Sequence, residues 1–406
     1  MDSSLLVVGG GAAGFFGALT AARAGISTEI LEKGPHPLRK VKISGGGRCN
    51  VTHACFDPRD LMTFYPRGGR ELRGAFHQFG PRETLDWFSQ RGVSLKTESD
   101  GRIFPTTDSS QTIIDCLQKE RTRQTIPLHL RTGVRHLRHL PEGGFRLTLL
   151  DGRERECRFC LLAPGSINGS PLPSSLRELG HHPTDPVPSL FTFHIADPAL
   201  HEMAGLSVSE AVATIPPLKT KQSGPILITH WGLSGPAILK LSAWAARDLH
   251  ALNYRFPLHI QWVPQSPEEL REEFRKQRQR NGKKTLSRAC PFALPRRLWQ
   301  YLLQQADAQS YTWARLPGAH QEKLIKHLHA QTFTVEGQSL NKEEFVTCGG
   351  IPLREVDFRT MESRVCPGLY FAGEILDLDG VTGGFNFQAA WTTGYLAGQS
   401  IRHRKT

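Results

Sequence analysis

Apolar positions are spaced most regularly at the start of the chain, where three elements follow in close order. Leu5–Val8 is a short apolar run of the kind that a buried parallel strand needs. A helix rich in small residues is expected to run through Arg23, because Gly25 then supplies a stop. Thr28–Glu32 has the pattern of a second strand. This order predicts a strand–helix–strand unit of about thirty residues.

Further along, the pattern changes three times, and the changes indicate how the chain is divided. Residues 186–263 contain short strands typical of an antiparallel β unit, and residues 264–339 have helical periodicity with many charges. After residue 340 the glycine-rich α/β pattern of the first segment returns. We therefore predict an α/β fold in which one domain, 1–185 with 340–406, is interrupted by an inserted domain, 186–339.

The turn between the first strand and the first helix carries a dinucleotide fingerprint, Gly9-x-Gly11-x-x-Gly14. In such a turn the first glycine allows the tight bend, the second lets the backbone approach a pyrophosphate, and the third allows close helix–strand packing. The helix start at Ala12 and Ala13 adds free N–H groups that face the phosphates. A plain glycine-rich helix start is the alternative.

Glu32 at the end of the second strand strengthens that interpretation, because a carboxylate there can accept hydrogen bonds from ribose hydroxyls. Lys33 beside it belongs to the same predicted contact set. A further apolar run, 159–162, leads into a turn at which Ala163 and Gly165 are predicted to approach the same cofactor.

A second glycine-rich segment follows the second strand and combines three glycines with polar and cationic neighbours. Its backbone is suited to press against a planar ring or a phosphate, whereas the alternative is an ordinary flexible loop. The predicted contacts in this segment are Lys42, Ser44, Gly46, Gly47, Arg48, Cys49 and Asn50.

A third glycine-rich segment, near the end of the chain, points to a flavin. A strand ending before Gly373 can place Glu374 on the ribityl hydroxyls. A helix that begins near Gly384 can aim its N-terminus at the flavin edge where negative charge accumulates on reduction. A single NAD would not need this second helix start, and a plain turn before a packed helix is the alternative. The predicted contacts are Gly373, Glu374, Gly384, Phe385, Asn386 and Phe387.

Together these segments resemble the BaiN/YhiN-like flavoprotein family over nearly the whole chain. The resemblance rests on GGGAAG at 9–14, KVKISGGGRCNVT at 40–52, GRIFPTTDSSQTIIDCL at 101–117, THWGLSGPAIL at 229–239 and a long block at 347–398. It implies a Rossmann-like FAD-binding domain with an inserted substrate domain, made of an antiparallel β-barrel and a helical subdomain. It also implies that the backbone near Val134 lies against the adenine.

Composition narrows the class of partner and the compartment. The 406 residues include 50 Lys and Arg against 38 Asp and Glu, and this net charge of +12 favours a polyanionic partner. The eight cysteines include a single CxxC pair, Cys157 and Cys160, so we expect free thiols, no metal site and a reducing compartment. Residues 3–22 lack charge but contain several glycines, so no membrane span is expected and a cytoplasmic location is predicted.

The resemblance implies two activities, and charge favours one of them. One is the reduction of a conjugated alkene in a small molecule, and the other is the reduction of a uridine in 23S ribosomal RNA to dihydrouridine. Both would use FAD, reduced by NAD(P)H, as the hydride source and an enzyme acid as the proton source. A steroid-sized acid needs one or two cations for binding, whereas affinity for an RNA backbone increases with the number of cations. The many cations therefore favour RNA reduction. A non-catalytic flavin-containing RNA-binding or redox-sensing protein is the third alternative.

The helical part of the insertion supplies the cations expected to bind RNA, and a solvated helix face is the alternative. Phe274 and Trp299 lie near them in the sequence and are expected to offer stacking surfaces for bases. The predicted RNA contacts are Arg275, Lys276, Arg278, Arg280, Lys283 and Lys284.

Two residues are candidates for the proton donor. Cys49 lies in the predicted flavin loop, where a thiol can protonate a uracil carbon, although a small buried cysteine is the commoner role. His230 lies in the THWGLSGP segment of the insertion, where the alternative is a histidine bonded to its own glycine-rich turn.

Overall fold

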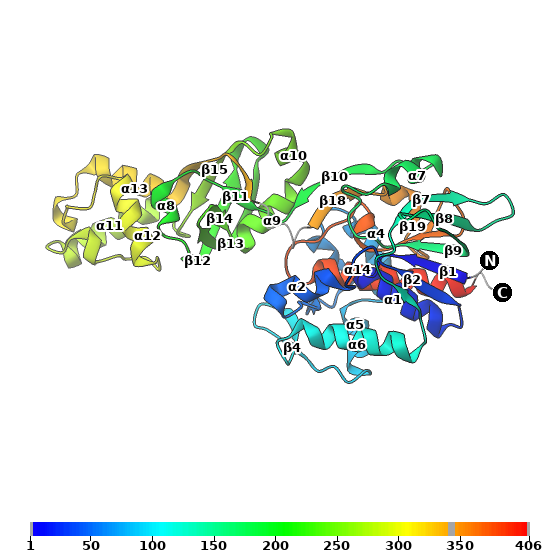
Figure 1. The fold of residues 1–406 in the computed structure, drawn as a ribbon. Coiled ribbons are helices and arrows are strands. Elements are labelled where there is room, and N and C mark those ends of the chain that lie inside the picture. Colours follow the sequence, from blue (N-terminus) through cyan, green and yellow to red (C-terminus); the bar gives the residue numbers. More distant parts are fainter. Residues whose placement is uncertain (1–2, 340–345, 404–406) are drawn as a thin grey trace. The chain divides into compact units, whose positions relative to one another are not determined.

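The computed structural model describes residues 3–339 and 346–403. The chain divides into two compact units, Met1–Pro188 with Lys342–Thr406, and Ser189–Asn341. In Figure 1 the first unit contains the blue and red segments, and the second contains most of the green and yellow ones.

Two neighbouring strands lead the chain out of the first unit and back into it. These strands, β10 (Thr184–Ser189) and β18 (Val346–Gly350), pair with each other. They approach so closely that a Cβ at Gly349 would lie 2.6 Å from the carbonyl oxygen of Asp185. The sequence predicts the boundaries of the inserted domain at 185/186 and 339/340. The second boundary lies next to residues 340–345, which are outside the described residues.

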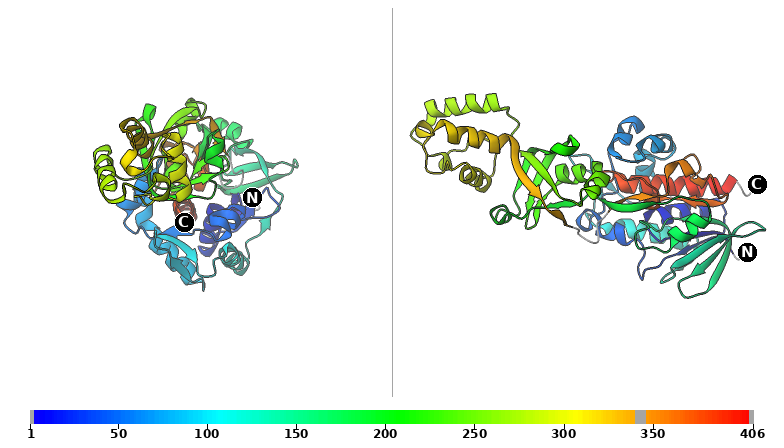
Figure 2. Two further views of the ribbon diagram at one scale, coloured as in Figure 1. Left: turned by 90° about the vertical axis from the view of Figure 1, so that its left-hand side faces the viewer. Right: turned by 90° about the horizontal axis from the view of Figure 1, so that it is seen from above.

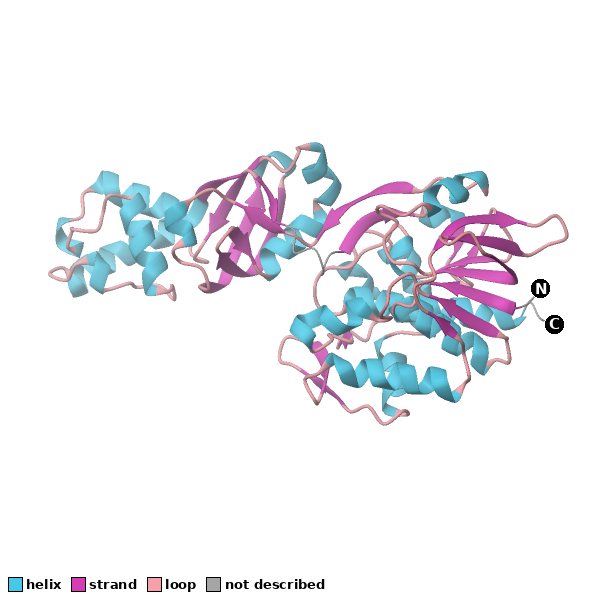
Figure 3. Cartoon of the chain, in the orientation of Figure 1, coloured by secondary structure: helices cyan, strands magenta, loops and turns pink. Residues whose placement is uncertain are grey.

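The first unit is built on a nine-stranded sheet (Figure 3). Its strands are β1 (Ser3–Val8), β2 (Thr28–Leu31), β6 (Leu128–His129), β7 (Val134–His139), β8 (Phe145–Leu149), β9 (Glu154–Leu162), β19 (Val356–Asp357), β20 (Glu362–Ser363) and β21 (Leu369–Phe371). The run β21-β9-β1-β2-β6 is parallel, and Leu5, Leu6 and Val7 of β1 are fully buried. Because parallel strands end at one edge, the segments that follow β1, β2, β9 and β21 come together there.

Helices and a small second sheet, β3-β5-β4, complete the first unit. The small sheet consists of β3 (Thr52–His53), β4 (Leu95–Thr97) and β5 (Arg102–Pro105). The helices are α1 (Ala12–Arg23), α2 (Arg39–Gly47), α3 (Pro58–Leu61), α4 (Gly69–Gln78), α5 (Pro81–Ser89), α6 (Ser110–Arg123), α7 (Leu172–Glu178) and α14 (Phe385–His403). The expected strand–helix–strand unit is thus confirmed as β1, α1 and β2.

Helices α1 and α14 pack with their backbones in contact (Figure 2). A Cβ at Gly394 would lie 2.4 Å from the carbonyl oxygen of Ala13, and a Cβ at Gly398 would lie 2.6 Å from that of Gly17. Between these two contacts the chain advances by four residues on α14 and by four residues on α1 in the same direction, so the helices run parallel. Glycine is therefore needed on α14 wherever it crosses the small residues of α1.

The second unit contains a seven-stranded sheet of order β16-β15-β12-β13-β14-β11-β17, with antiparallel ladders. Its strands are β11 (Thr192–His194), β12 (Ser207–Ile215), β13 (Thr220–Thr229), β14 (Gly232–Ser234), β15 (Phe256–Gln261), β16 (Gln331–Val335) and β17 (Gly337–Ser339). Residues 331–339 close this sheet on itself, because β16 pairs with β15 and β17 pairs with β11, while only Glu336 separates β16 from β17. The N–H of Glu336 donates to the carbonyl oxygen of His194 and continues the ladder, so the predicted antiparallel β-barrel is confirmed.

Six helices accompany this sheet in the described part of the unit. They are α8 (Pro198–His201), α9 (Pro236–Trp244), α10 (Ala246–Ala251), α11 (Pro267–Asn281), α12 (Arg296–Gln305) and α13 (Gly318–Ala330). The predicted helical segment ran to residue 339, but residues 331–335 alternate between buried and exposed positions and return to the sheet as β16. Within the described residues, no helix has the length and apolar character that crossing a bilayer would require.

Aromatic side chains form the core of the helical part. Phe274 is fully buried against Trp313, with ring centroids 5.3 Å apart. Trp299 is 1% exposed, and its Nε1 donates to the carbonyl oxygen of Leu286 at 2.7 Å. The expectation that Phe274 and Trp299 offer stacking surfaces is therefore wrong, because their rings pack against other helices instead.

Candidate cofactor site at the carboxyl edge of the sheet

The fingerprint turn is shaped by contacts within the protein and by an open space beside it. Gly9 has a φ of +111°, and a Cβ there would lie 2.2 Å from the carbonyl oxygen of Ala163 at the end of β9. A Cβ at Gly14 would lie 1.9 Å from the carbonyl oxygen of Gly9. A Cβ at Gly11, in contrast, would meet no protein atom within 4 Å. Gly11 therefore borders space that a pyrophosphate can approach, as the second fingerprint glycine requires.

Glu32 lies against this turn. Its two carboxylate oxygens accept from the backbone N–H groups of Gly10 and Gly34, each at 2.7 Å. Each oxygen keeps a further lone pair, so the carboxylate can still accept from a ribose hydroxyl. The exposed Lys33 lies beside Gly133, and Val134 begins β7 directly after it. The structure thus brings Glu32, Lys33 and Val134 to one place.

Glu374 occupies a corresponding position after β21. Its carboxylate accepts from Lys40 Nζ at 2.5 Å and from the backbone N–H of Thr347 at 3.0 Å. A Cβ at Gly165 would lie 3.7 Å from the same carboxylate, and one at Gly373 would lie 2.9 Å from the Cβ of Ala13. Segments predicted separately from four parts of the chain therefore meet at one edge of the sheet.

The second glycine-rich segment is partly helical, which corrects the loop expected from Lys42 onward. Helix α2 extends to Gly47, with a break at Ser44 in extended backbone followed by left-handed glycines. Lys42 is exposed, and the Ser44 hydroxyl donates to the carbonyl oxygen of Val41 at 2.9 Å. A Cβ at Gly46 or Gly47 would meet no protein atom within 4 Å. The hydrogen bond of Ser44 thus fixes the turn, and the backbone of Gly46 and Gly47 remains accessible to a ligand.

Arg48 is engaged by protein groups rather than left open to a phosphate. Its Nη1 donates to Glu98 at 2.7 Å and lies 3.5 Å from Asp108. Its guanidinium also lies over the ring of Phe104, 4.0 Å from the centroid. The hydrogen bond to Glu98 is the main cause that raises the pKa of Arg48. In this structure Arg48 orders the segment around the site, and its predicted contact with the cofactor is untested.

Asn50 connects the second segment to the third. In the amide orientation that satisfies its neighbours, its oxygen accepts from the backbone N–H of Gly384 at 3.0 Å, and its nitrogen donates to the carbonyl oxygen of Thr52 at 2.9 Å. Gly384 has a φ of +93°, and a Cβ there would lie 2.6 Å from that same oxygen. The start of α14 is therefore held close to β3.

The first residues of α14 are fixed by aromatic and amide contacts. Phe385 stacks on Phe64, with centroids 4.4 Å apart, and on His53, at 4.8 Å. Asn386 accepts from and donates to the backbone of Gly380 at 2.9 and 2.8 Å. Phe387 stacks on Trp391 at 5.6 Å. These side chains fix the start of α14. The backbone N–H groups of its first turn can donate to a negatively charged edge of a ligand.

Cys49 is a poor candidate for the proton donor in this structure. Its side chain is fully buried, and its φ is +61°. Burial raises the pKa of its thiol to about 12, and a hydrogen bond with Ser44 lowers it by less. A thiol without exposed surface cannot touch a substrate, so the structure favours the packing role that was the alternative for Cys49.

Thiol labelling tests this assignment. At pH 8 a thiol with a pKa of about 12 is thiolate in only about one molecule in ten thousand. Iodoacetamide is therefore expected to modify the half-buried Cys55 and Cys290 in the native protein and to leave Cys49 unmodified, as read by peptide mass spectrometry. Denatured protein, in which all eight cysteines react, is the control. Labelling of Cys49 at the rate of Cys55 would contradict its burial.

His230 lies in the second unit, in the turn between β13 and β14, and its side chain is exposed. The turn itself is closed by Thr229, whose hydroxyl donates to the carbonyl oxygen of Gly232 at 3.2 Å and accepts from the N–H of Trp231 at 3.3 Å. Trp231 is 59% exposed, and sequence reasoning missed it. Its place beside His230 in the THWGLSGP segment was the available signal.

The six predicted RNA contacts differ in how far protein groups already engage them. Arg278 donates to the carbonyl oxygen of Leu316 at 2.8 Å and is half-buried, so the prediction that it contacts RNA is replaced by a structural role. Arg275 is exposed and pairs with Glu272 at 2.5 Å. The remaining four side chains are exposed on and after α11, and we call them the cationic face: Lys276, Arg280, Lys283 and Lys284.

Neither cysteine of the CxxC pair points to a metal. Cys157 and Cys160 are buried on β9, and the hydrogen bond between the two thiols, together with burial, raises the pKa of Cys160. Among the described residues, no group of three or more His, Cys, Asp or Glu side chains could hold a metal ion.

Comparison with known proteins agrees with this site. The family described as HI0933-like protein Rossmann domain matches residues 3–400. The ribosomal RNA dihydrouridine synthase of Escherichia coli (strain K12) is 29% identical over an alignment of 408 positions, which covers 98% of this chain and 97% of that protein. The 3-dehydro-bile acid delta(4,6)-reductase of Clostridium scindens is 28% identical over 98% of both chains. The resemblance inferred from the sequence motifs is thereby confirmed.

Among solved structures, the likeness is one of fold. The 3-ketosteroid-delta4-(5alpha)-dehydrogenase from Rhodococcus jostii RHA1 has a TM-score of 0.52 at 14% identity, over 98% of this chain and 96% of that chain. A 3-ketosteroid delta1-dehydrogenase from Sterolibacterium denitrificans has a TM-score of 0.53 at 11% identity, over 99% of both chains.

Proposed function

Because the chain belongs to the HI0933-like protein Rossmann domain family, we propose that this FAD-dependent oxidoreductase reduces a uridine in 23S ribosomal RNA to dihydrouridine. The main support is the cationic face of the inserted unit, which offers more exposed positive charge than a small substrate needs. A relative of similar length, matched over 98% of the chain, is named for the same reaction.

The carboxyl edge of the sheet fits FAD. Gly11 borders open space for the pyrophosphate, and Glu32 keeps lone pairs for the ribose. Glu374 is placed for the ribityl chain, and the start of α14 can face the flavin edge where negative charge develops on reduction. FAD, when bound, supplies the hydride that the reaction consumes.

The substrate imposes two further requirements on the chain. The uracil C5–C6 double bond takes up a hydride and a proton, so an acid must reach the base, and the exposed His230 is our candidate. The base must also leave its stack, which needs unpaired or easily opened RNA. NAD(P)H is proposed as the reductant that binds transiently, because the sequence contains one dinucleotide fingerprint.

A small conjugated alkene is the rival substrate, since a relative at 28% identity is named a bile acid reductase. That function would make binding insensitive to salt and indifferent to RNA. A non-catalytic flavin-containing RNA-binding or redox-sensing protein is the other alternative, and in it NAD(P)H would not turn over the flavin.

An anaerobic experiment tests the proposal directly. The flavin of the purified protein is reduced with NADPH, and unmodified large-subunit rRNA, free or in a partly assembled particle, is then added. We expect reoxidation of the flavin together with dihydrouridine at a single position of the digested RNA. Flavin that stays reduced with both RNA forms, but is reoxidised by a conjugated enone, would replace the RNA substrate by a small molecule.

Trp231 should contribute to RNA binding through stacking. Because its ring is 59% exposed, Trp231→Ala is expected to weaken binding of a short single-stranded rRNA fragment about tenfold, within the range of one base stacked on an aromatic ring. Fluorescence anisotropy measures this change. Trp244→Ala removes a ring of similar exposure, 42%, from α9 and is the matched control. Equal losses in both variants would remove the special role of Trp231.

A further inference from the structure

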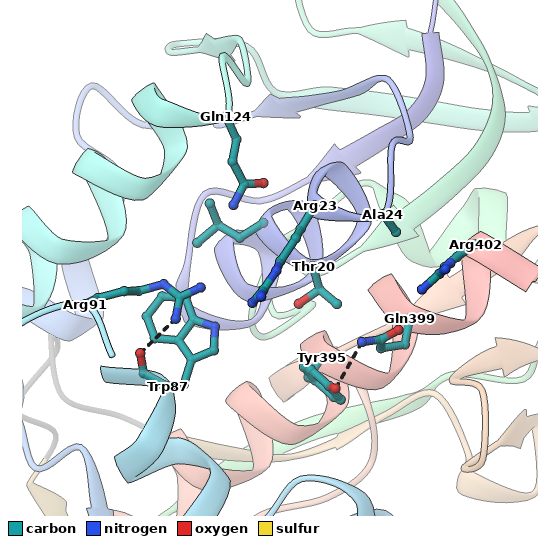
Figure 4. A pocket seen from close by; sticks show the side chains of 10 residues that line it. Thr20, Arg23, Ala24, Trp87, Arg91, Gln124, Tyr395, Gln399 and Arg402 are labelled. Atoms are coloured by element: carbon teal, nitrogen blue, oxygen red, sulfur yellow. Dashed lines mark hydrogen bonds between the residues drawn. The ribbon is translucent and has the colours of Figure 1, made fainter. Parts of the chain in front are cut away.

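The first unit contains a hollow of about 350 Å³ at the C-terminal ends of α1 and α14 (Figure 4). Arg23 and Arg402 lie at the ends of these helices, and Arg91 follows α5. Since α1 has 12 residues, it rises about 18 Å from the fingerprint turn to this end. The hollow is therefore separate from the candidate cofactor site.

The hollow is strongly positive. Its ten lining residues, all described, include the three arginines and no acidic side chain. Glu120 lies behind it, 3.6 Å from Arg91 and 2.7 Å from Arg123. Among the described residues, Arg23 and Arg402 have no carboxylate within ion-pair distance, and both are exposed. Of the three lining guanidinium groups, only that of Arg91 is therefore paired with a carboxylate among the described residues.

Two buried polar atoms of the lining lack a hydrogen-bond partner among the described residues: the donor Arg91 Nε and the acceptor Gln124 Oε1, of which only the donor can serve an anion. Figure 4 shows Arg23, Arg91 and Gln124 pointing toward the same space from different elements. The Arg91 guanidinium lies 3.8 Å above the Trp87 ring and is 13% exposed. Burial lowers the pKa of Arg91, and the charges of Arg23 and Arg123 lower it further against the opposing effect of Glu120. The positive charges of Arg23, Arg91 and Arg123 are therefore close enough to oppose one another, and a bound anion would relieve this repulsion.

Helix ends explain part of this arrangement. A cation in the last turn of a helix is stabilised by the helix dipole, and Arg23 and Arg402 each occupy such a turn. The helix dipole explains why Arg23 and Arg402 each lie at a helix C-terminus. It does not account for their convergence with Arg91 around a hollow that contains buried, unpartnered polar atoms.

We propose that this hollow binds the phosphate group of a small phosphorylated molecule. Guanidinium groups form paired hydrogen bonds with phosphate oxygens, and a phosphate monoester brings close to two negative charges and three acceptor oxygens. The volume lies within the range of small-molecule pockets. Trp87 is already covered by Arg91 and packs on Phe16 at 4.6 Å, so recognition rests on the phosphate rather than on stacking of a base.

Calorimetric titration of the FAD-loaded protein with pyrophosphate, at constant ionic strength, tests this proposal. FAD fills the glycine-rich site, so pyrophosphate reports on the hollow. The double variant Arg23→Gln, Arg402→Gln is expected to bind pyrophosphate at least tenfold more weakly, about 1.4 kcal/mol, with unchanged FAD content. Arg123→Gln removes a charge from the same neighbourhood outside the lining and is expected to stay within about twofold of the parent protein.

Three results would overturn the proposal. The first is the absence of saturable pyrophosphate binding by the parent protein. The second is citrate binding as tightly as pyrophosphate, which would indicate a general response to polyanions. The third is a single-stranded RNA oligonucleotide that competes with pyrophosphate and loses affinity equally in the double variant, which would make the hollow part of a nucleic-acid surface.

Discussion

Replacing Gly11 with alanine is expected to leave the protein folded and to weaken FAD binding about 100-fold, roughly 2.7 kcal/mol. The added Cβ meets no protein atom within 4 Å, and the backbone at Gly11, with a φ of −88°, accepts alanine without strain. The methyl group would instead occupy the space into which the pyrophosphate must come. Flavin fluorescence on titration of the apoprotein measures the affinity, and circular dichroism checks the fold.

Two further glycine variants separate the cofactor from the fold. Gly14→Ala is expected to destabilise the apoprotein itself, because its Cβ would lie 1.9 Å from the carbonyl oxygen of Gly9. Gly74→Ala, in α4, adds a Cβ with no neighbour within 4 Å and should leave both stability and FAD affinity intact or slightly improved. Normal FAD binding by Gly11→Ala would mean that the pyrophosphate does not lie at this turn.

Removal of two lysines of the cationic face should give the largest effect on RNA. Lys283→Ala with Lys284→Ala is expected to reduce affinity for an rRNA fragment at least tenfold at about 0.1 M salt, because two phosphate contacts are lost. The slope of log affinity against log salt should become shallower by about 1.5. Both are measured by filter binding over a salt series, and the FAD content should not change.

Arg73→Ala with Lys119→Ala is the matched control for that variant. It removes the same formal charge from exposed positions of the first unit. If the control changes the salt slope as much as the lysine pair does, RNA responds to net charge alone and the cationic face has no special role. If neither variant changes the slope, the basis for an RNA substrate in the inserted unit is lost.

Local patterns predicted the elements that depend on near neighbours. The apolar run at Leu5–Val8, the helix through Arg23 and the strand at Thr28–Glu32 were placed within two residues of β1, α1 and β2, because their structure is decided by residues nearby in the chain. The convergence of Glu32 and Glu374 also followed from sequence, since parallel strands end at one edge.

Contacts between distant segments could not be predicted in this way. Arg48 pairs with Glu98, and Arg278 binds the carbonyl oxygen of Leu316, although both cations look available in the sequence. Phe274 and Trp299 belong to different helices and both pack on Phe292 in one core, while Trp231 and Trp244 keep exposed rings. Tertiary packing decides which of several similar side chains remains in water, and spacing does not reveal it.

The parallel contact of α1 with α14 has a consequence for biosynthesis. Helix α1 leaves the ribosome well before α14, because residues 24–384 are translated between the two helices. Closing so large a chain loop is slow and entropically costly. Until then the side of α1 that α14 will cover is unpaired, and it carries Phe16, whose ring packs on Trp391 of α14 at 5.0 Å, beside the small residues Ala13 and Gly17. Because the candidate cofactor site needs both the fingerprint turn before α1 and the start of α14, flavin capture is expected to be a late event in maturation.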